Sequence, residues 1–261
     1  MLTDLNPLRA ALPSGLVALD FDGTLAPISP RPRDARPFPG VLQILRDVRA
    51  TGAVLAVITG RSVASLLRVS SFGDVPGIVI YGTHGAERWQ AGELRAPQSP
   101  PGLDELRLTL PKLVTSIADD PALWIEDKDL SLVIHARLTA DPDRVLDMLR
   151  APVGEAAAAA GLGLRPGKEV LEVCIPGIDK GTAIRELIGD GTAAAFYAGD
   201  DVGDLPAMQE VNAWADRSAR PKLTVAVSPH GNGPLAGESD VTVPDPPGLM
   251  TLLRQIIGHV A

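Results

Sequence analysis

The sequence predicts an α/β protein whose parallel-sheet core is interrupted by a smaller inserted α/β unit. Continuous apolar runs alternate with amphipathic stretches in the first 81 residues and again from residue 180 onward. The intervening region instead contains two pairs of short apolar runs, each pair preceded by a long amphipathic stretch. Strand and helix in strict alternation, with strands that are apolar throughout, are typical of a parallel sheet covered on both faces.

The first part of the core is predicted from three apolar runs. Each is bounded by turn residues, and apolar residues at helical spacing lie between them. The expected order is strand 16–21, helix 41–50, strand 53–58, helix 62–69 and strand 78–81.

The same alternation resumes near the C-terminal end. We expect a helix over 180–188, a strand over 193–198, a short helix over 205–210, a strand over 223–227 and a helix over 249–260.

The middle region predicts two helices and two hairpins. A helix over 103–117 precedes strands 123–125 and 130–138, and a helix over 143–160 precedes strands 162–165 and 169–175. This order suits a small sheet with both helices on one face. Proline and glycine cluster at 98–102 and 176–179, which indicates the hinges. The expected domains are therefore a core of 1–101 and 177–261 and an inserted cap of 102–176.

Composition restricts the possible partners and location. The net charge of −8 argues against sequence-independent nucleic-acid binding and against binding to anionic membranes. Cys174 is the single cysteine, and no apolar run approaches the length of about 20 residues that spans a bilayer. The N-terminus lacks the basic start and apolar stretch of a signal peptide. We expect a cytoplasmic monomer that acts on a small molecule.

Two carboxylates follow the first predicted strand. Side chains alternate along a strand, so Asp20 and Asp22 lie on one side and Phe21 on the other. Neighbouring acids repel unless a positive charge lies between them, and Mg²⁺ prefers carboxylate oxygen. Asp pairs also serve as turn or cap residues.

Other polar residues follow neighbouring strands, whose carboxyl ends form the ligand-binding edge of a parallel sheet. They are Thr59 and Arg61, the glycine-rich run 82–87, and Asp200, Asp201 and Asp204, with Lys180 at the start of a helix. Thr59 could alternatively be a helix N-cap, Lys180 a solvated helix residue, and Asp204 a cap.

The combination predicts phosphoryl transfer. Asp20 attacks phosphorus, and Asp22 protonates the leaving oxygen and then activates water. Mg²⁺ is held by Asp20, Asp200 and the backbone carbonyl of Asp22. Thr59 and Lys180 hold the phosphoryl oxygens.

Four motifs in this order resemble the haloacid dehalogenase superfamily of phosphatases. They are Asp20-Phe-Asp-Gly-Thr-Leu25, Ile58-Thr-Gly-Arg61, Lys180-Gly181 and Gly199-Asp-Asp-Val-Gly-Asp204. The resemblance implies a Rossmann-like core, a C2-type cap and the catalytic roles above. It also implies a metal group formed by Asp20, Asp22, Asp200, Asp201 and Asp204, in which Asp204 mostly supports the metal indirectly.

A narrower set of motifs resembles the trehalose-6-phosphate phosphatases. The matching segments are 81–87, 125–128, 135–137, 167–173 and 179–181. The resemblance implies a Mg²⁺-dependent hydrolase of trehalose biosynthesis. The residues that it places near the substrate are Arg61, His84, Glu87, Lys128, His135, Lys168 and Glu172.

The chain departs from this family at two points. Val202-Gly-Asp-Leu-Pro206 replaces a Thr-Asp-Glu continuation, and the Arg often found before Pro176 is absent. Another sugar phosphate, such as sucrose phosphate or a glycosylated phosphoglycerate, is an alternative substrate, and a non-catalytic sugar-phosphate sensor is an alternative function. His84 and Glu87 could instead fix their own loop, and Lys128 could be an ordinary exposed charge.

Overall fold

A computed structural model describes residues 4–29, 31–167, 169–229, 233 and 235–258. It divides into two compact units. We call Met1–Arg95 with Asp179–Ala261 the core unit, and Ala96–Ile178 the inserted unit. Within the described ranges, no helix is long and apolar enough to cross a membrane.

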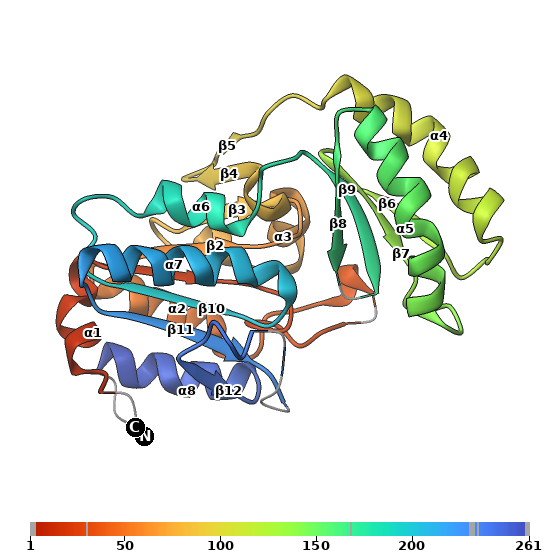
Figure 1. Cartoon of the computed structure of the whole chain (residues 1–261). Helices are drawn as coiled ribbons and strands as arrows, with labels where there is room; N and C mark the ends of the chain where they lie inside the picture. The colour runs from red at the N-terminus through yellow and green to blue at the C-terminus, as the bar shows by residue number, and fades with distance from the viewer. Residues whose placement is uncertain (1–3, 30, 168, 230–232, 234, 259–261) are drawn as a thin grey trace. The chain divides into compact units, whose positions relative to one another are not determined.

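The core unit contains an eight-stranded sheet in the order β12-β11-β10-β1-β2-β3-β4-β5 (Figure 1). Its strands are β1 Leu16–Leu19, β2 Val54–Ile58, β3 Val79–Gly82, β4 Glu87–Gln90, β5 Glu93–Arg95, β10 Ala195–Gly199, β11 Lys222–Val227 and β12 Val241–Val243. All neighbours from β12 to β3 are parallel, whereas β4 and β5 add an antiparallel hairpin at one edge. The predicted α/β class is confirmed, and the edge hairpin and β12 were not predicted.

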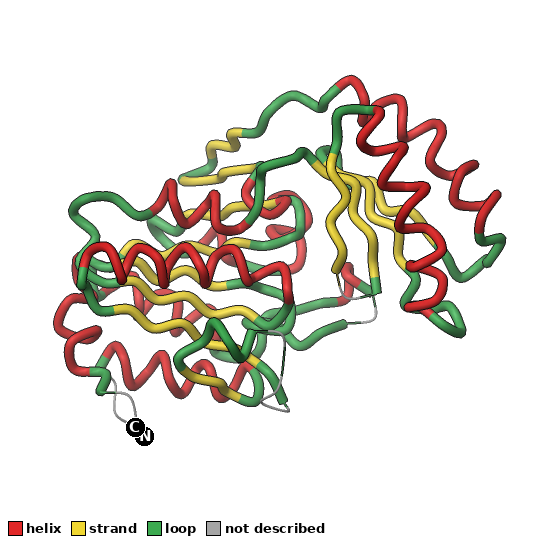
Figure 2. The backbone as a smooth tube through the Cα atoms, in the orientation of Figure 1, coloured by secondary structure: helices red, strands yellow, loops and turns green. Residues whose placement is uncertain are grey.

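Helices cover both faces of this sheet (Figures 1 and 2). One face packs against α1 Asn6–Ala11, α2 Val41–Ala50, α3 Val63–Val69 and α8 Pro246–Ile257. The other packs against α6 Lys180–Leu187 and α7 Leu205–Ser218. Helix α7 is longer than the sequence predicted, and the side chain of Ser62, not Thr59, caps α3.

The inserted unit has an antiparallel sheet in the order β6-β7-β9-β8. Its elements are α4 Pro101–Ile117, β6 Trp124–Asp127, β7 Ser131–His135, α5 Pro142–Ala159, β8 Gly163–Gly167 and β9 Val170–Cys174. Leu132, Ile134, Leu171 and Val173 share one apolar cluster with residues of both helices. Since side chains alternate along a strand, Ser131, His135 and Glu172 lie on the opposite face of the sheet. The predicted order of helices and strands is confirmed.

Candidate active site

The central strands of the core unit bring three predicted residues to one edge. Strand β1 lies between β10 and β2 with all three parallel, so their carboxyl ends lie side by side. Asp20 directly follows β1, Thr59 follows β2 and Asp200 follows β10. This edge is where open parallel sheets bind ligands.

Three carboxylates form an acidic cluster at this edge. One oxygen from each of Asp20, Asp200 and Asp204 lies within 4.8 Å of the others. The approach of Asp200 depends on Gly23, because a Cβ at that position would lie 2.0 Å from Oδ2 of Asp200. Gly23 also has φ +80°, a conformation that L-residues with side chains rarely adopt.

Lys180 neutralises part of this negative charge. Its ammonium donates hydrogen bonds to Oδ1 of Asp20 at 2.6 Å and to Oδ1 of Asp204 at 2.7 Å. Asp179 caps α6 through a reciprocal pair of hydrogen bonds with Thr182, and this fixes the first turn that carries Lys180. Burial alone would lower the pKa of Lys180, but the two carboxylates overcome that effect and raise it. Lys180 is therefore a cation beside the predicted nucleophile.

The cluster fits a divalent cation. Burial is the largest cause that raises the pKa of Asp20 to about 7, with Lys180 opposing the shift and Asp204 adding to it. Burial, followed by the charges of Asp20 and Asp204, raises the pKa of Asp200 to about 9. Two carboxylates that resist ionisation next to each other are a suitable donor set for a hard cation. The side chains suited to bind it are those of Asp20 and Asp200.

Asp204 and Asp201 have other contacts. The carboxylate of Asp204 accepts hydrogen bonds from Lys180, from the Tyr197 hydroxyl at 2.5 Å, and from the backbone N–H groups of Asp200 at 3.0 Å and Asp201 at 3.1 Å. These four donors match the approximately four acceptor sites of a carboxylate. The side chain of Asp201 accepts from the N–H of Val202 at 2.5 Å and caps a short 3₁₀ helix. Both residues thus organise the loop after β10.

Tyr197 is a polar residue that the sequence analysis did not select. It is fully buried in β10, and its hydroxyl contacts the same Asp204 oxygen as Lys180. Burial and the nearby charge of Asp204 raise the pKa of Tyr197 well above its ordinary value, so the phenol stays a hydrogen-bond donor. An aromatic residue within an apolar strand carries no signal that separates this role from ordinary core packing.

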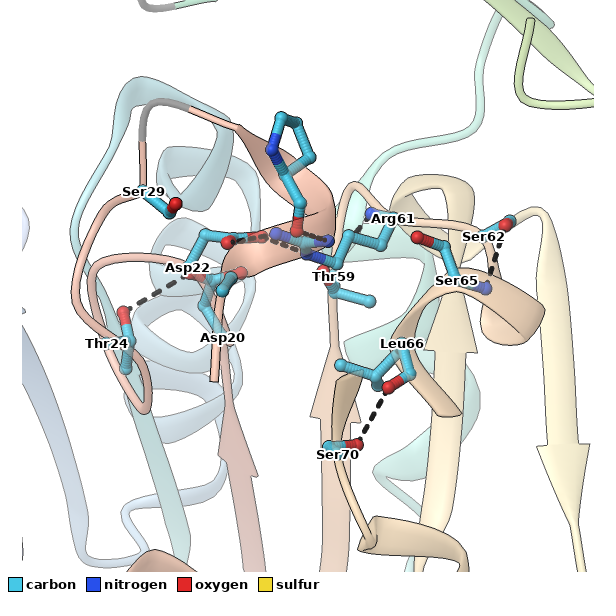
Figure 3. Close-up of polar contacts among 12 residues, drawn as sticks. Asp20, Asp22, Thr24, Ser29, Thr59, Arg61, Ser62, Ser65, Leu66 and Ser70 are labelled. Atoms are coloured by element: carbon cyan, nitrogen blue, oxygen red, sulfur yellow. Dashed lines mark hydrogen bonds and ion pairs between the residues drawn. The ribbon is translucent and has the colours of Figure 1, made fainter. Parts of the chain in front are cut away.

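Asp22 is paired with Arg61 (Figure 3). Nε of Arg61 donates to Oδ2 of Asp22 at 2.6 Å, and a terminal nitrogen donates to Oδ1 at 2.7 Å. The other terminal nitrogen donates to the Pro32 carbonyl at 2.7 Å. Figure 3 places the Asp22 carboxylate close to Asp20 and turned toward Arg61. The predicted acid/base residue and a predicted substrate ligand therefore contact each other.

The remaining predicted core residues lie near the ends of β2 and β3. Thr59 is buried, and its hydroxyl oxygen accepts from the N–H of Arg61 at 3.2 Å. The ring of His84 lies against Gly60, where a Cβ would be 2.8 Å from Nε2. Glu87 is buried, and its Oε2 accepts from the Val63 N–H at 2.8 Å. The Glu87 contact holds the start of α3, and substrate binding by His84 and Glu87 stays a prediction.

The sheet face of the inserted unit opposite its helices carries a polar cluster around Glu172. The buried carboxylate of Glu172 accepts from the Ser131 hydroxyl at 2.7 Å and from Arg165 at 3.0 Å, and Lys128 lies 3.9 Å away. Sequence reasoning selected Lys128 and Glu172 but not Ser131 or Arg165. Lys168 lies outside the described residues.

His135 belongs to a second polar group on this face. Its Nε2 lies 2.9 Å from Oε2 of Glu126, and its ring stacks on Trp124 with centroids 4.4 Å apart. Its Nδ1 is buried without a hydrogen-bond partner among the described residues. Trp124 was not selected from the sequence, because an aromatic residue in a short strand is usual.

Comparison with known proteins identifies the fold class. A solved haloacid dehalogenase-like hydrolase from Bacteroides thetaiotaomicron superimposes with a TM-score of 0.61 at 16% identity, covering 93% of this chain and 99% of that one. The crystal structure of a trehalose-6-phosphate phosphatase related protein superimposes with a TM-score of 0.73 at 26% identity, covering 94% and 97%. The fold is thus the haloacid dehalogenase-like fold with a cap domain.

The sequence comparisons define the family. The trehalose-phosphatase family model matches residues 18–245. The trehalose-phosphate phosphatase of Mycobacterium avium is 33% identical over 211 residues, which is 75% of this chain and 51% of that protein. This chain spans about half the length of the mycobacterial phosphatases that it matches. The chain belongs to the trehalose-phosphatase family.

Proposed function

We propose that the protein hydrolyses trehalose 6-phosphate to trehalose and phosphate in a Mg²⁺-dependent reaction that passes through an aspartyl-phosphate on Asp20. Membership of the trehalose-phosphatase family supports the substrate. The observation that carries the chemistry is the buried Asp20 carboxylate, 2.6 Å from the Lys180 ammonium at the ligand-binding edge of the sheet. This pair combines a nucleophile with a cation that can stabilise a phosphoryl group.

In the first step, an Asp20 oxygen forms a bond to phosphorus while the bond from phosphorus to the sugar oxygen breaks. Asp22 donates its proton to the departing oxygen, which leaves as the trehalose hydroxyl. The Thr59 hydroxyl and the Lys180 ammonium hold phosphoryl oxygens while their charge rearranges.

In the second step, water attacks the phosphorus of the aspartyl-phosphate. Asp22, now a carboxylate, accepts a proton from that water, and the bond between phosphorus and Asp20 breaks. Phosphate leaves, and both aspartates return to their starting states. One residue thus serves as acid and then as base, as the reversal of proton flow requires.

The residues that would hold Mg²⁺ are Asp20 and Asp200, together with the backbone carbonyl of Asp22. When bound, the ion supplies positive charge that offsets the repulsion between a phosphate dianion and a carboxylate nucleophile. The raised pKa values of Asp20 and Asp200 support this assignment, since a cation relieves the cause of both shifts. The four hydrogen bonds to Asp204 favour an indirect role for that residue.

We further propose that the polar sheet face of the inserted unit binds the sugar. A disaccharide offers hydroxyl and ether oxygens, so its site needs fixed hydrogen-bond donors and acceptors. Glu172 is an acceptor whose orientation Ser131 and Arg165 fix, and Lys128 and His135 add polar groups nearby. Lys168 is included from its sequence position alone.

A phosphate-release screen tests this function. Trehalose 6-phosphate, sucrose 6-phosphate, a glycosylated phosphoglycerate and glucose 6-phosphate are compared with Mg²⁺ and with a chelator. We expect the highest kcat/KM for trehalose 6-phosphate and loss of turnover on chelation. A higher value for another sugar phosphate would contradict the substrate, and binding without phosphate release would identify a sensor.

Asp20→Asn tests the mechanism separately. The variant keeps the shape of the side chain but lacks a nucleophilic carboxylate, so turnover should vanish while substrate still binds. Phosphate release at the wild-type rate would exclude Asp20 as the nucleophile. Trapping ³²P on the wild-type chain from labelled substrate, and its absence in the variant, provides a direct readout.

A further inference from the structure

All three nitrogens of the Arg61 guanidinium donate hydrogen bonds within the core unit. Only 7% of its side chain is exposed, and it forms a two-point contact with Asp22 and a third contact with the Pro32 carbonyl (Figure 3). A forked pair of N–H···O bonds between arginine and carboxylate fixes both distance and orientation. The side chain of Asp22 is 41% exposed, and among the described residues its carboxylate accepts both of its side-chain hydrogen bonds from Arg61.

The position of Arg61 is itself fixed from several directions. Its N–H donates to the Thr59 hydroxyl at 3.2 Å, and its carbonyl accepts from the Thr83 N–H at 2.7 Å. The guanidinium carbon lies 5.3 Å from the centroid of the Phe21 ring, within the range of a cation–π contact. Arg61 thus connects the ends of β1, β2 and β3 through contacts that require no ligand.

We propose that Arg61 is a positioning residue that holds the Asp22 carboxylate for proton transfer, and that it does not itself bind the substrate. This inference rests on the proposed role of Asp22 as acid and base. The terminal torsion of an aspartate is broad, so an unrestrained carboxylate samples many orientations. The two-point contact removes that freedom before substrate arrives.

The two-point contact between Arg61 and Asp22 is also compatible with the proton transfers. Each Asp22 oxygen has about two acceptor positions, so one oxygen can give a proton to the leaving sugar oxygen, or later take one from the attacking water, while both oxygens stay in contact with Arg61. The proton passes between Asp22 and the reacting oxygen, and Arg61 keeps all of its protons throughout. A lysine would keep the charge but not the two-point contact.

A double-mutant cycle tests this role. Kcat/KM is measured for wild type, Arg61→Gln, Arg61→Lys, Asp22→Asn and the double variant Arg61→Gln/Asp22→Asn, with Arg46→Gln on the exposed face of α2 as the control. The substrates are propyl phosphate, which has a poor leaving group, and 4-nitrophenyl phosphate, which has a good one. Neither contains a sugar, so loss of sugar recognition does not enter the comparison.

We expect Arg61→Gln to lower kcat/KM for propyl phosphate by about 10²-fold, as loss of acid–base catalysis does. Arg61→Lys should behave similarly, whereas the loss for 4-nitrophenyl phosphate should be below about tenfold. The double variant should match Asp22→Asn, because residues that act through one another are not additive. Retained turnover of 4-nitrophenyl phosphate also shows that the variants are folded.

Two outcomes would overturn the proposal. Losses that multiply in the double variant would show that Arg61 acts independently of Asp22. Equal losses on both substrates, expressed mainly in KM, would show that Arg61 binds the phosphoryl group. The sugar-phosphate screen on the wild-type protein tests the assignment of trehalose 6-phosphate independently of this cycle. If that screen identifies another preferred substrate, the cycle is repeated on it.

Discussion

The carboxylate of Asp200 occupies the space that a side chain at Gly23 would need. Oδ2 and Oδ1 of Asp200 lie 2.0 Å and 2.8 Å from the position of a Cβ on Gly23. The side chain at position 23 is therefore limited in size by the carboxylate of Asp200, which follows β10 almost 180 residues later in the sequence. Position 23 controls how closely Asp200 can approach Asp20.

Gly23→Ala should remove most activity because the methyl group displaces Asp200. A shift of about 1 Å in a catalytic group can cost about 10²-fold in rate. We expect at least that loss in kcat/KM and weaker Mg²⁺ binding, measured by phosphate release and isothermal titration calorimetry. Gly92→Ala is the matched control, because Gly92 has φ +88° but no atom within 4 Å of its Cβ position. A similar loss of activity in both variants would attribute the effect to backbone strain.

Tyr197→Phe should weaken the site without removing any proposed catalytic group. Asp204 loses one of its four donors, and a hydrogen bond to a charged group contributes about 1.5–3 kcal/mol. We expect a lower melting temperature and a fall in kcat, since Asp204 also holds Lys180. Tyr81→Phe is the control, as that buried tyrosine lies in β3 of the same sheet and its hydroxyl accepts from Arg88 at 3.2 Å. Unchanged kcat in Tyr197→Phe would show that Lys180 does not depend on this contact.

The metal-free protein should lose stability as pH rises. Burial raises the pKa of Asp20 from 3.8 to about 7 and that of Asp200 to about 9. The folded state then binds more protons than the unfolded state between about pH 4 and pH 9, so the free energy of unfolding falls across that window. Lys180 adds no slope there, because it is charged in both states. Thermal unfolding in a chelator measures the trend.

Added Mg²⁺ should reverse this trend. The ion competes with protons for the same carboxylates, so its stabilising effect should be larger at pH 9 than at pH 5. Asp200→Asn should reduce both the pH slope of the metal-free protein and the gain on adding Mg²⁺. An identical slope in wild type and Asp200→Asn would show that other groups set the pH dependence.

Glu172→Ala should affect the sugar substrate selectively. If the polar sheet face binds the sugar, kcat/KM for trehalose 6-phosphate should fall by about 10²-fold or more, as when a buried hydrogen-bonding partner of a charged group is lost. Activity on 4-nitrophenyl phosphate should remain within about threefold of wild type. Glu155→Ala, on the exposed side of α5, is the control. Equal losses on both substrates would indicate a structural role for Glu172.

Much of this architecture could be predicted from the sequence because strand ends locate chemistry in parallel sheets. Asp20 and Lys180 lie 160 positions apart, yet the expected parallel strands and helix start place them at one edge. The pairing of Asp22 with Arg61 could not be predicted in this way. Arginine is long and flexible, and its guanidinium is held here by the ring of Phe21 and the backbone carbonyl of Pro32, which only the folded chain brings together.

Other features escaped prediction for related reasons. Tyr197 is an aromatic residue in an otherwise apolar strand. Its hydroxyl has a role only because the loop after β10 brings the Asp204 carboxylate within hydrogen-bond distance. The hairpin of β4 and β5 contains charged, exposed residues such as Glu93 and Arg95, so it has no apolar run to mark it. Strand β4 is defined by its pairing with β3 and β5 by its pairing with β4, which is information from the fold.

Phe21 contacts both the apolar interior of the core unit and the proposed active site. Its ring meets Phe72 edge-on at 5.7 Å and supports the guanidinium that orients Asp22. A substitution made at Phe72 to improve heat resistance should therefore also change turnover, through the contact between Phe21 and Arg61. Thermal stability and turnover rate are therefore coupled at Phe72, and engineering one of them there changes the other.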